Sequence, residues 1–142
     1  MKKILIVDDE ESTRLLYAEE LADEGYEVIA TSDCSGLMAL IKKLRPDIVV
    51  LDIRLGEWDG LDLLQKIRSA YYDMPVILCS AYSVYKYDMK SMAADYYVVK
   101  SYDLAELKHK IRKALESVMQ FQKMGDALAG ELKIEGNLVM RL

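Results

Sequence analysis

The residues best suited to chemistry stand where short apolar runs end. Residues 48–51 form one such run, Ile-Val-Val-Leu, and Asp52 follows it directly. Comparable runs end on further polar residues, which are Asp8 and Asp9, Ser80, and Lys100. A short apolar run with β-branched members and flanking turn residues is typical of a strand buried on both faces. Since the carboxyl ends of parallel strands meet at one edge of a sheet, we expect these side chains to share a pocket.

Such a pocket would suit phosphoryl transfer. Three carboxylates repel one another in a medium less polar than water, and a hard divalent cation, above all Mg²⁺, would relieve that repulsion. The ammonium group of Lys100 would act in the same sense. A hydroxyl at Ser80, beside an ammonium and Mg²⁺, would complete a cradle for phosphoryl oxygens. Asp52 in this cradle can act as a nucleophile and become an aspartyl phosphate.

Each of these residues also has an ordinary structural interpretation. A strand-end Asp, Ser or Lys, taken alone, is more often a solvated turn or capping residue. The combination is different, because a paired Asp, a single Asp, a hydroxyl and a lysine end successive apolar runs in one order. We therefore interpret the set as a functional site.

The composition restricts the class of protein. The chain has 142 residues, 52% of them hydrophobic and 30% charged, which fits one globular domain. A net charge of −5 argues against nucleic acid as a direct partner. We expect no membrane span and no signal peptide, because no apolar run approaches roughly 20 residues and the start is soon acidic. Cys34 and Cys79 lack metal-site spacing, and Cys79 is expected to be a core thiol, so we expect a cytoplasmic protein.

Strand and helix patterns alternate five times along the chain. The expected strands are residues 3–7, 27–30, 48–51, 76–79 and 95–99. The expected helices are residues 12–24, 36–44, a segment opening at 59 or 60, residues 82–93, and a segment capped by Asp103. The first helix should place Leu15, Ala18, Leu21 and Ala22 on one face. The second should be capped by Ser35 or Asp33, and the fourth is weak because Tyr, Ser and Val are mediocre helix formers. This alternation predicts an α/β fold, a parallel sheet with helices on both faces.

Five motifs carry a specific resemblance. They are Ile-Val-Asp-Asp-Glu at 6–10, Arg-Pro-Asp-Ile-Val-Val-Leu-Asp at 45–52, Asp-Gly at 59–60, Pro-Val-Ile-Leu-Cys-Ser-Ala at 75–81, and Asp-Tyr-Tyr-Val-Val-Lys at 95–100. With them the chain resembles the receiver domain of response regulators in two-component signalling, from about Lys2 to Glu116. The resemblance implies a three-layer flavodoxin-like (βα)5 fold whose parallel five-stranded sheet has the order 2-1-3-4-5.

The resemblance also implies roles for the polar residues. Asp52 would be the phosphoacceptor, receiving its phosphoryl group from a histidine kinase or a phosphotransfer protein. Asp9 would bind Mg²⁺ directly, Asp8 mainly through water, and the backbone carbonyl of Arg54 would complete the protein ligands together with Asp52. The protein would be a signalling phosphoacceptor rather than an enzyme acting on a separate substrate.

The remaining implied roles concern the response to phosphorylation. Lys100 would pair with the phosphoryl oxygens, and Ser80 would hydrogen-bond to them. Movement of Ser80 would draw Tyr97 inward, a two-state element whose balance phosphorylation shifts. The fourth helix, fifth strand and fifth helix would form the face that meets a downstream protein, and six tyrosines gather in this region.

Three departures from the family pattern bear on the site. Ser101 follows Lys100 where the family has Pro, so the isomer of this peptide bond is an open question. Gly56 stands where the family tends to have Pro, and the loop there is expected to be more mobile. Arg54 and Tyr82, both bulky, occupy the variable positions beside the phosphorylation site, and we expect them to hinder the attacking water and prolong the aspartyl phosphate.

The C-terminal part lies beyond the resemblance. We divide the chain into a receiver domain, 1–120, and an extension, 121–142. Val118, Phe121 and Leu128 would continue the apolar stripe of the fifth helix to about residue 129, which suggests association, including a homodimer. Residues 131–142 are typical of a short hairpin with a Gly-Asn turn.

Two other functions are compatible with parts of the sequence. A receiver-like adaptor that no longer cycles would fit the Lys-Ser departure, although the five polar site residues oppose it. An aspartyl-phosphate hydrolase would need a second acid near the nucleophile, which Asp52-Ile53-Arg54 does not supply.

Overall fold

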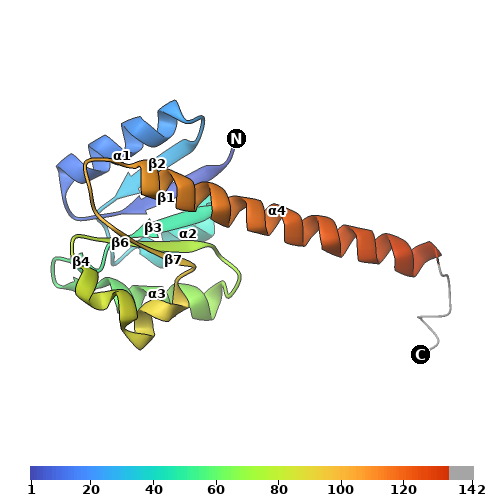
Figure 1. The fold of residues 1–142 in the computed structure, drawn as a ribbon. Coiled ribbons are helices and arrows are strands. Elements are labelled where there is room, and N and C mark those ends of the chain that lie inside the picture. The colour runs from blue at the N-terminus through green and yellow to red at the C-terminus, as the bar shows by residue number, and fades with distance from the viewer. Residues whose placement is uncertain (135–142) are drawn as a thin grey trace.

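A computed structural model describes residues 1–134 of the chain, and its centre is a parallel five-stranded sheet (Figure 1). The strands are β1 (Lys3–Val7), β2 (Glu27–Thr31), β3 (Ile48–Leu51), β6 (Val76–Ser80) and β7 (Tyr96–Val99). Their order is β2-β1-β3-β6-β7. The predicted strands, the parallel sheet and the order 2-1-3-4-5 are therefore confirmed.

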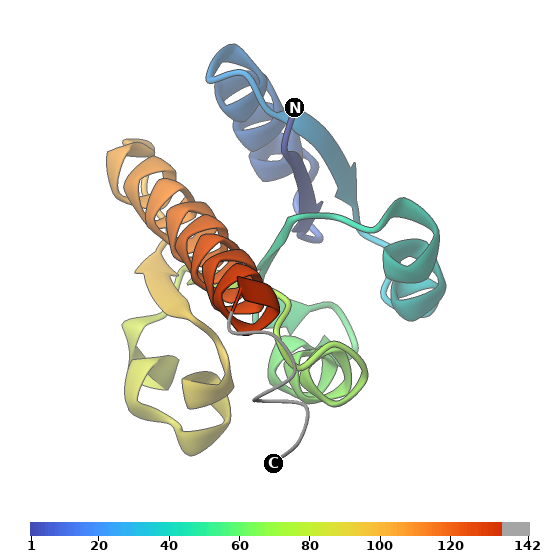
Figure 2. The ribbon, with the colours of Figure 1, turned by 90° about the vertical axis from the view of Figure 1, so that its right-hand side faces the viewer.

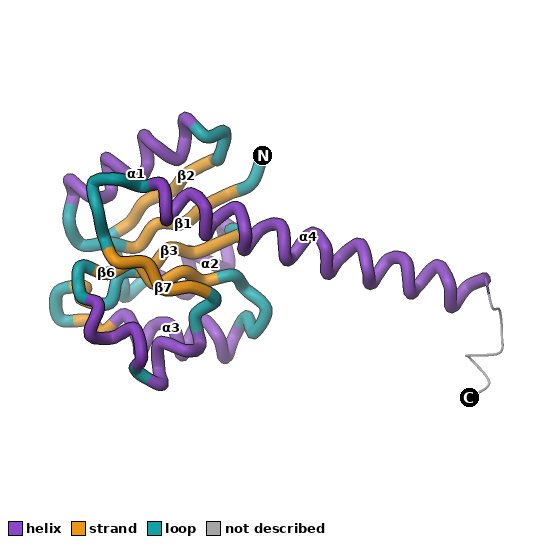
Figure 3. The backbone as a smooth tube through the Cα atoms, in the orientation of Figure 1, coloured by secondary structure: helices purple, strands orange, loops and turns teal. Residues whose placement is uncertain are grey.

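Helices cover both faces of this sheet. They are α1 (Glu11–Asp23), α2 (Leu37–Leu44), α3 (Gly60–Ala70) and α4 (Ala105–Ile134). One core cluster joins Leu5 and Val7 to α2 and α3, and a second joins Ile4 and Ile6 to α1 and α4. Alternate residues of β1 thus enter opposite cores, as a strand buried on both sides requires. The views in Figures 2 and 3 show the resulting three layers.

The segment between β6 and β7 differs from the prediction of one helix over residues 82–93. It forms two short 3₁₀ helices, η1 (Ser83–Tyr87) and η2 (Met89–Ala93). Asp88 separates them, with an extended backbone and a side chain that accepts a hydrogen bond from the Lys90 amide at 2.9 Å. A side chain that bonds a nearby backbone amide competes with continuous helix, and 3₁₀ geometry is tolerated only in short pieces.

Other local predictions have mixed outcomes. Leu15 is 63% exposed, so its assignment to the apolar face of α1 is wrong, whereas Leu21 is buried as predicted, together with Tyr17. Asp33, rather than Ser35, accepts the hydrogen bond from the Gly36 amide before α2. Asp103 accepts a hydrogen bond from the Ala105 amide at the start of α4, as predicted, and Asp59 accepts one from the Leu61 amide in the first turn of α3.

The cysteine and peptide-bond questions are also answered. Cys79 is a core thiol as predicted, and burial raises its pKa to about 11. The peptide bond between Lys100 and Ser101 is trans. Among the described residues, no helix combines the length and the apolar character needed to cross a membrane.

A small element follows Asp52 that the sequence analysis did not predict. Strands β4 (Arg54–Leu55) and β5 (Trp58–Asp59) pair antiparallel and lead into α3. Gly56 lies in the turn between them with φ of 64°. Proline cannot adopt a positive φ, which explains the glycine at this position.

Helix α4 is longer than predicted and leaves the domain (Figure 1). It has 30 residues and ends at Ile134, beyond the predicted end near residue 129. Residues 131–134, which the hairpin prediction assigned to a strand, are helical instead. A single unpaired strand has no hydrogen-bond partner for its backbone, whereas a helix satisfies its own. The remainder of the predicted hairpin lies outside the described residues.

Candidate functional site

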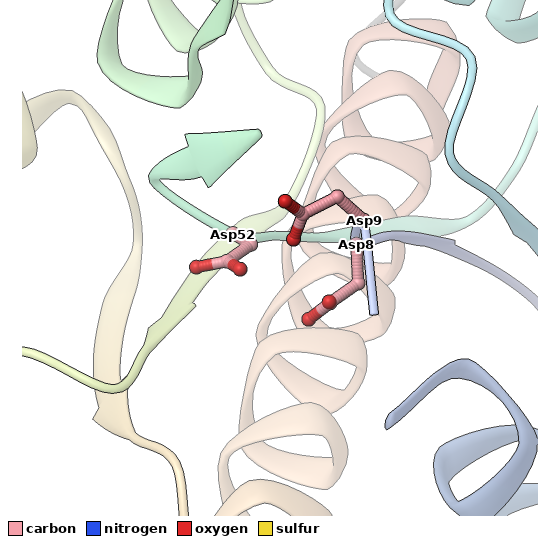
Figure 4. A group of neighbouring side chains, drawn as sticks. All are labelled: Asp8, Asp9 and Asp52. Carbon is pink, nitrogen blue, oxygen red and sulfur yellow. The ribbon is translucent and has the colours of Figure 1, made fainter. Parts of the chain in front are cut away.

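Three carboxylates meet at the carboxyl edge of the sheet (Figure 4). Asp8 and Asp9 directly follow β1, and Asp52 follows the neighbouring strand β3. One carboxylate oxygen from each residue lies within 4.8 Å of the others. Asp8 and Asp52 are buried, at 2% and 6% exposure, while Asp9 is open to solvent. The site therefore combines two buried carboxylates with a third that solvent can reach.

Lys100 connects the two buried carboxylates. Its Nζ lies 2.7 Å from Asp8 Oδ2 and 2.9 Å from Asp52 Oδ2. Burial alone would lower the pKa of Lys100, but the hydrogen bonds and negative charges of Asp8 and Asp52 outweigh burial and raise it. The lysine is thus held as a cation at the end of β7, where the sequence analysis placed it.

Backbone contacts fix both buried carboxylates from the other side. Asp52 Oδ1 accepts a hydrogen bond from the Ile53 amide at 2.8 Å, and Asp8 Oδ1 accepts one from the Glu10 amide at 2.9 Å. Burial raises the pKa of Asp52, and Asp8 adds to this, whereas Lys100 and the Ile53 amide act to lower it. Each carboxylate is oriented before any ligand arrives.

Gly60 holds the backbone behind Asp52. A Cβ at this position would lie 1.9 Å from the Asp52 carbonyl oxygen and 2.7 Å from the Ile53 Cα. The Gly60 amide donates to the Ile53 carbonyl. Only glycine permits this close approach of α3 to the site, which is the physical reason for the Asp-Gly pair at 59–60.

Ser80 and Tyr97 both contact the backbone of Tyr82. Ser80 is fully buried at the end of β6, and its Oγ accepts a hydrogen bond from the Tyr82 amide at 3.2 Å. The Tyr97 hydroxyl donates to the Tyr82 carbonyl. Burial raises the pKa of Tyr97, so it stays a neutral donor. The backbone of Tyr82 therefore links the two residues.

An arginine and two tyrosines form a cover beside the site. The Arg54 guanidinium lies 4.2 Å from the centre of the Tyr82 ring and donates to the Tyr85 hydroxyl at 3.2 Å. The two tyrosine rings meet edge to face, with centres 6.4 Å apart. A guanidinium stacked on an aromatic face is an attractive arrangement. It joins the loop after Asp52 to η1.

Sequence reasoning identified the charged residues of the site but missed several that hold them. The predicted residues Asp8, Asp9, Asp52 and Lys100 converge, and Ser80 ends the adjacent strand. The sequence analysis noted Gly60 without a role, and it counted Tyr85 only as one of several tyrosines. The position of Gly60 directly after Asp59 at a helix start was the available signal for the role of Gly60. Nothing in the sequence pairs Arg54 with Tyr85.

Comparison with known proteins gives one consistent family. The sequence model of the response regulator receiver domain matches residues 4–112. The chain is 34% identical to the regulatory protein AtoC of Escherichia coli (strain K12) over 118 residues, 82% of this chain and 26% of AtoC. It is 30% identical to the alkaline phosphatase synthesis transcriptional regulatory protein PhoP of Bacillus subtilis (strain 168), over 94% of this chain and 60% of PhoP. The chain thus spans less than two thirds of either relative.

Solved structures agree with the sequence comparison. The response regulator TrrA of Thermotoga maritima, in complex with Mg²⁺-BeF, superposes with a TM-score of 0.78 and 43% identity, over 81% of this chain and 100% of TrrA. A structure of TrrA in complex with the histidine kinase ThkA superposes with a TM-score of 0.72 and 46% identity, over 81% of this chain and 99% of the matched chain.

Proposed function

Because the chain belongs to the response regulator receiver domain family, we propose that Asp52 is its phosphoacceptor. The domain works in two-component signal transduction. The observation that carries the assignment of Asp52 is its position, buried beside Lys100 at 2.9 Å and within reach of two further carboxylates. Asp8 shares the contact with Lys100, but Asp52 follows β3, the strand that pairs directly with β6, and Ser80 ends β6.

The transfer converts a phosphohistidine into an aspartyl phosphate. A carboxylate oxygen of Asp52 forms the new bond to phosphorus, and the bond between phosphorus and the histidine nitrogen of the donor breaks, returning histidine. Lys100 already contacts Asp52 and would neutralise phosphoryl oxygens as they arrive. The Ser80 hydroxyl would donate its hydrogen to a phosphoryl oxygen, which can only accept.

The residues present fit a magnesium ion. Carboxylate oxygens are the ligands that Mg²⁺ prefers, and the ion, when bound, neutralises phosphoryl charge. Within the described part of the chain the Asp9 carboxylate has no hydrogen bond or ion pair, which supports it as a direct ligand. Asp8 already contacts Lys100 and the Glu10 amide, which supports a contact through water. The Asp52 carboxylate and the Arg54 carbonyl would complete the protein ligands.

The response to phosphorylation would pass through the backbone of Tyr82. When Ser80 turns toward the phosphoryl group, its hydrogen bond to the Tyr82 amide is strained or lost. The Tyr97 hydroxyl, which donates to the Tyr82 carbonyl, would then move with the backbone of Tyr82. This coupling would bias a two-state element at the surface, where η1, η2, β7 and α4 meet.

That surface is the proposed contact for a downstream protein. It holds a groove of about 330 Å³ lined by Tyr87, Tyr96, Tyr97 and Lys110 among others. Tyr87 is 82% exposed, and tyrosine is enriched at interfaces because it offers large area with a polar tip. The proposed phosphoryl donor is a histidine kinase or a phosphotransfer protein, as the complex of TrrA with ThkA suggests. Two buried free thiols support a cytoplasmic location.

Intact-mass measurement with acetyl phosphate and Mg²⁺ tests the assignment of Asp52. The wild-type chain should gain one phosphoryl group, and Asp52→Asn should gain none. Equal labelling of both proteins would refute Asp52 as the acceptor. No labelling of either would favour the adaptor alternative, or a strict requirement for a kinase. Beryllofluoride binding by the wild type, absent in Asp52→Asn, would separate these two by showing an intact phosphoryl site.

A further inference from the structure

Two contacts hold the guanidinium of Arg54 beside the phosphoacceptor. The guanidinium lies over the Tyr82 ring, 4.2 Å from the ring centre, and one of its N–H groups donates to the Tyr85 hydroxyl at 3.2 Å. Arg54 is exposed and follows Asp52 by two residues. A long exposed side chain keeps one position only where its contacts offset the loss of rotamer freedom. The two tyrosines therefore decide where this guanidinium lies.

The two contacts differ in what they fix. An aromatic face attracts a cation without setting its direction in the plane of the ring, so stacking on Tyr82 tolerates sliding and rotation. A hydrogen bond weakens steeply as its angle departs from linear, and the planar guanidinium carries its N–H groups in a rigid fork. The Tyr85 hydroxyl thus sets the direction of the guanidinium over the Tyr82 ring.

Tyr85 is the more firmly held of the two tyrosines. Its ring is half-buried and packs against the core cluster between the sheet and helices α2 and α3, whereas Tyr82 is 42% exposed. The backbone of Tyr82 also contacts Ser80 and Tyr97, and it is the part that phosphorylation would displace. A guanidinium held by Tyr82 alone would move with that backbone. The contact with Tyr85 keeps the guanidinium tied to the core instead.

The same contact borders a small cavity that contains a spectroscopic reporter. The cavity has a volume of about 240 Å³, and Arg54, Tyr85 and Trp58 are among the residues that line it. Trp58 is the single tryptophan of the chain and is 43% exposed. Release of Arg54 from Tyr85 would open the cavity to small solutes. The fluorescence of Trp58 therefore reports on this contact without any phosphoryl transfer.

We propose that Tyr85 is a positioning residue that prolongs the aspartyl phosphate by holding Arg54 beside the path of the attacking water. The proposal rests on Asp52 as the phosphoacceptor. In hydrolysis a water oxygen bonds to phosphorus and the bond between phosphorus and the Asp52 oxygen breaks, which gives the Asp52 carboxylate, inorganic phosphate and a proton. Attack is in line with the breaking bond, so water must enter from the open side of the pocket. A fixed guanidinium leaves less room on that side than one that swings freely.

The rate of phosphoryl loss in four proteins tests this role. Wild type, Tyr85→Phe, Arg54→Ala and the double variant are labelled with acetyl phosphate and Mg²⁺, and the donor is then removed. Tyr85→Phe keeps the ring and removes only the hydroxyl, and it should speed the loss by roughly three- to tenfold, the factor that one hydrogen bond contributes. In the Arg54→Ala background the same substitution should change the rate by less than about twofold, because the group that Tyr85 positions is absent.

A matched control separates this effect from a general effect of removing a tyrosine hydroxyl. Tyr72 is 81% exposed and precedes β6, so it lies at the opposite edge of the sheet, and Tyr72→Phe should lose its phosphoryl group like the wild type. Equal acceleration by Tyr85→Phe with and without Arg54 would overturn the proposal, since it would show a loosened fold. Normal labelling of Tyr85→Phe with an unchanged rate of loss would overturn it too, and would leave Asp52 as the acceptor.

Acrylamide quenching of Trp58 fluorescence tests the contact separately. Quenching should rise in Tyr85→Phe and in Arg54→Ala, and the double variant should show no further rise over Arg54→Ala. Unchanged quenching in Tyr85→Phe would show that the hydroxyl does not hold Arg54, which would refute the proposal whatever the phosphoryl group does. Failure of the wild type to bind either a phosphoryl group or beryllofluoride would instead refute the proposed function, and the role of Tyr85 in hydrolysis would fall with it.

Discussion

Removal of the Lys100 ammonium should destabilise the protein far more than removal of a comparable surface lysine. Lys100 lies between Asp8 Oδ2 and Asp52 Oδ2, at 2.7 and 2.9 Å, and both carboxylates are more than nine-tenths buried. The substitution Lys100→Met keeps a side chain of similar length and removes only the charge. The two carboxylates then face each other without a counter-ion.

The size of the loss has an upper bound. When a buried ion pair loses one partner, about 3–5 kcal/mol of stability is lost. The folded variant can escape part of that cost by protonating Asp52. At pH 7 the protonation of a carboxyl with an ordinary pKa near 3.9 costs roughly 4 kcal/mol. We therefore expect a loss of about 3–4 kcal/mol at pH 7 without divalent cations.

The same reasoning gives the pH dependence. Burial already raises the pKa of Asp52 in the wild type, and without Lys100 that pKa rises further above its unfolded value. The folded variant then binds more protons than the unfolded chain, so its stability falls as pH rises from about 4 upward. At pH 5 the protonation cost is only about 1.5 kcal/mol, and the variant should lose no more than that. Saturating Mg²⁺ should restore part of the stability, since a cation replaces the lost charge.

Urea unfolding with EDTA at pH 5 and pH 7 would measure these differences. Lys108→Met is the matched control, because Lys108 also contacts two carboxylates, Glu20 at 2.8 Å and Glu24 at 3.3 Å, but at the surface. Exposed pairs contribute little, so this variant should differ much less from the wild type and should show no comparable pH dependence. If Lys100→Met lost less than about 1 kcal/mol at pH 7, or lost the same at both pH values, the argument from buried carboxylates would be refuted.

Three further predictions concern the Arg54–Tyr82 pair beside the site, the close approach of Gly60 to Asp52, and the backbone contacts of Arg68. Arg54→Asn combined with Tyr82→Glu should speed loss of the phosphoryl group by on the order of tenfold or more, because groups that orient water replace groups that exclude it; little change in a phosphoryl-decay assay would count against the cover. Gly60→Ala should cost roughly 3 kcal/mol in urea unfolding and slow phosphorylation, because the new Cβ would displace the Asp52 backbone; unchanged stability and uptake would contradict that contact. Arg68→Ala should cost about 2–3 kcal/mol, since its guanidinium binds three backbone carbonyls and one carboxylate, and Arg68→Lys should recover only part; full recovery by lysine would show that charge alone matters.

The fold and the charged part of the site follow from local patterns. Apolar runs such as 48–51 need a buried strand, and short α/β connections leave few topologies for five of them. Once the strands are parallel, Asp8, Asp52 and Lys100 share an edge whatever the rest of the chain does. The prediction of one helix over residues 82–93 was wrong for a local reason too, because Asp88 caps a new turn in the middle of that segment.

Tertiary packing decided how the side chains use that edge. The sequence places Lys100 near three carboxylates, but only the folded chain directs it to the two buried ones and leaves Asp9 open to solvent. The stacking of Arg54 on Tyr82 depends on the path of η1, which no periodicity predicts. Strand order depends on the pattern of apolar runs and on the length of the connections between them, and both can be read from the sequence. Side-chain partners depend on distances of a few ångströms between segments far apart in the chain, which exist only after packing.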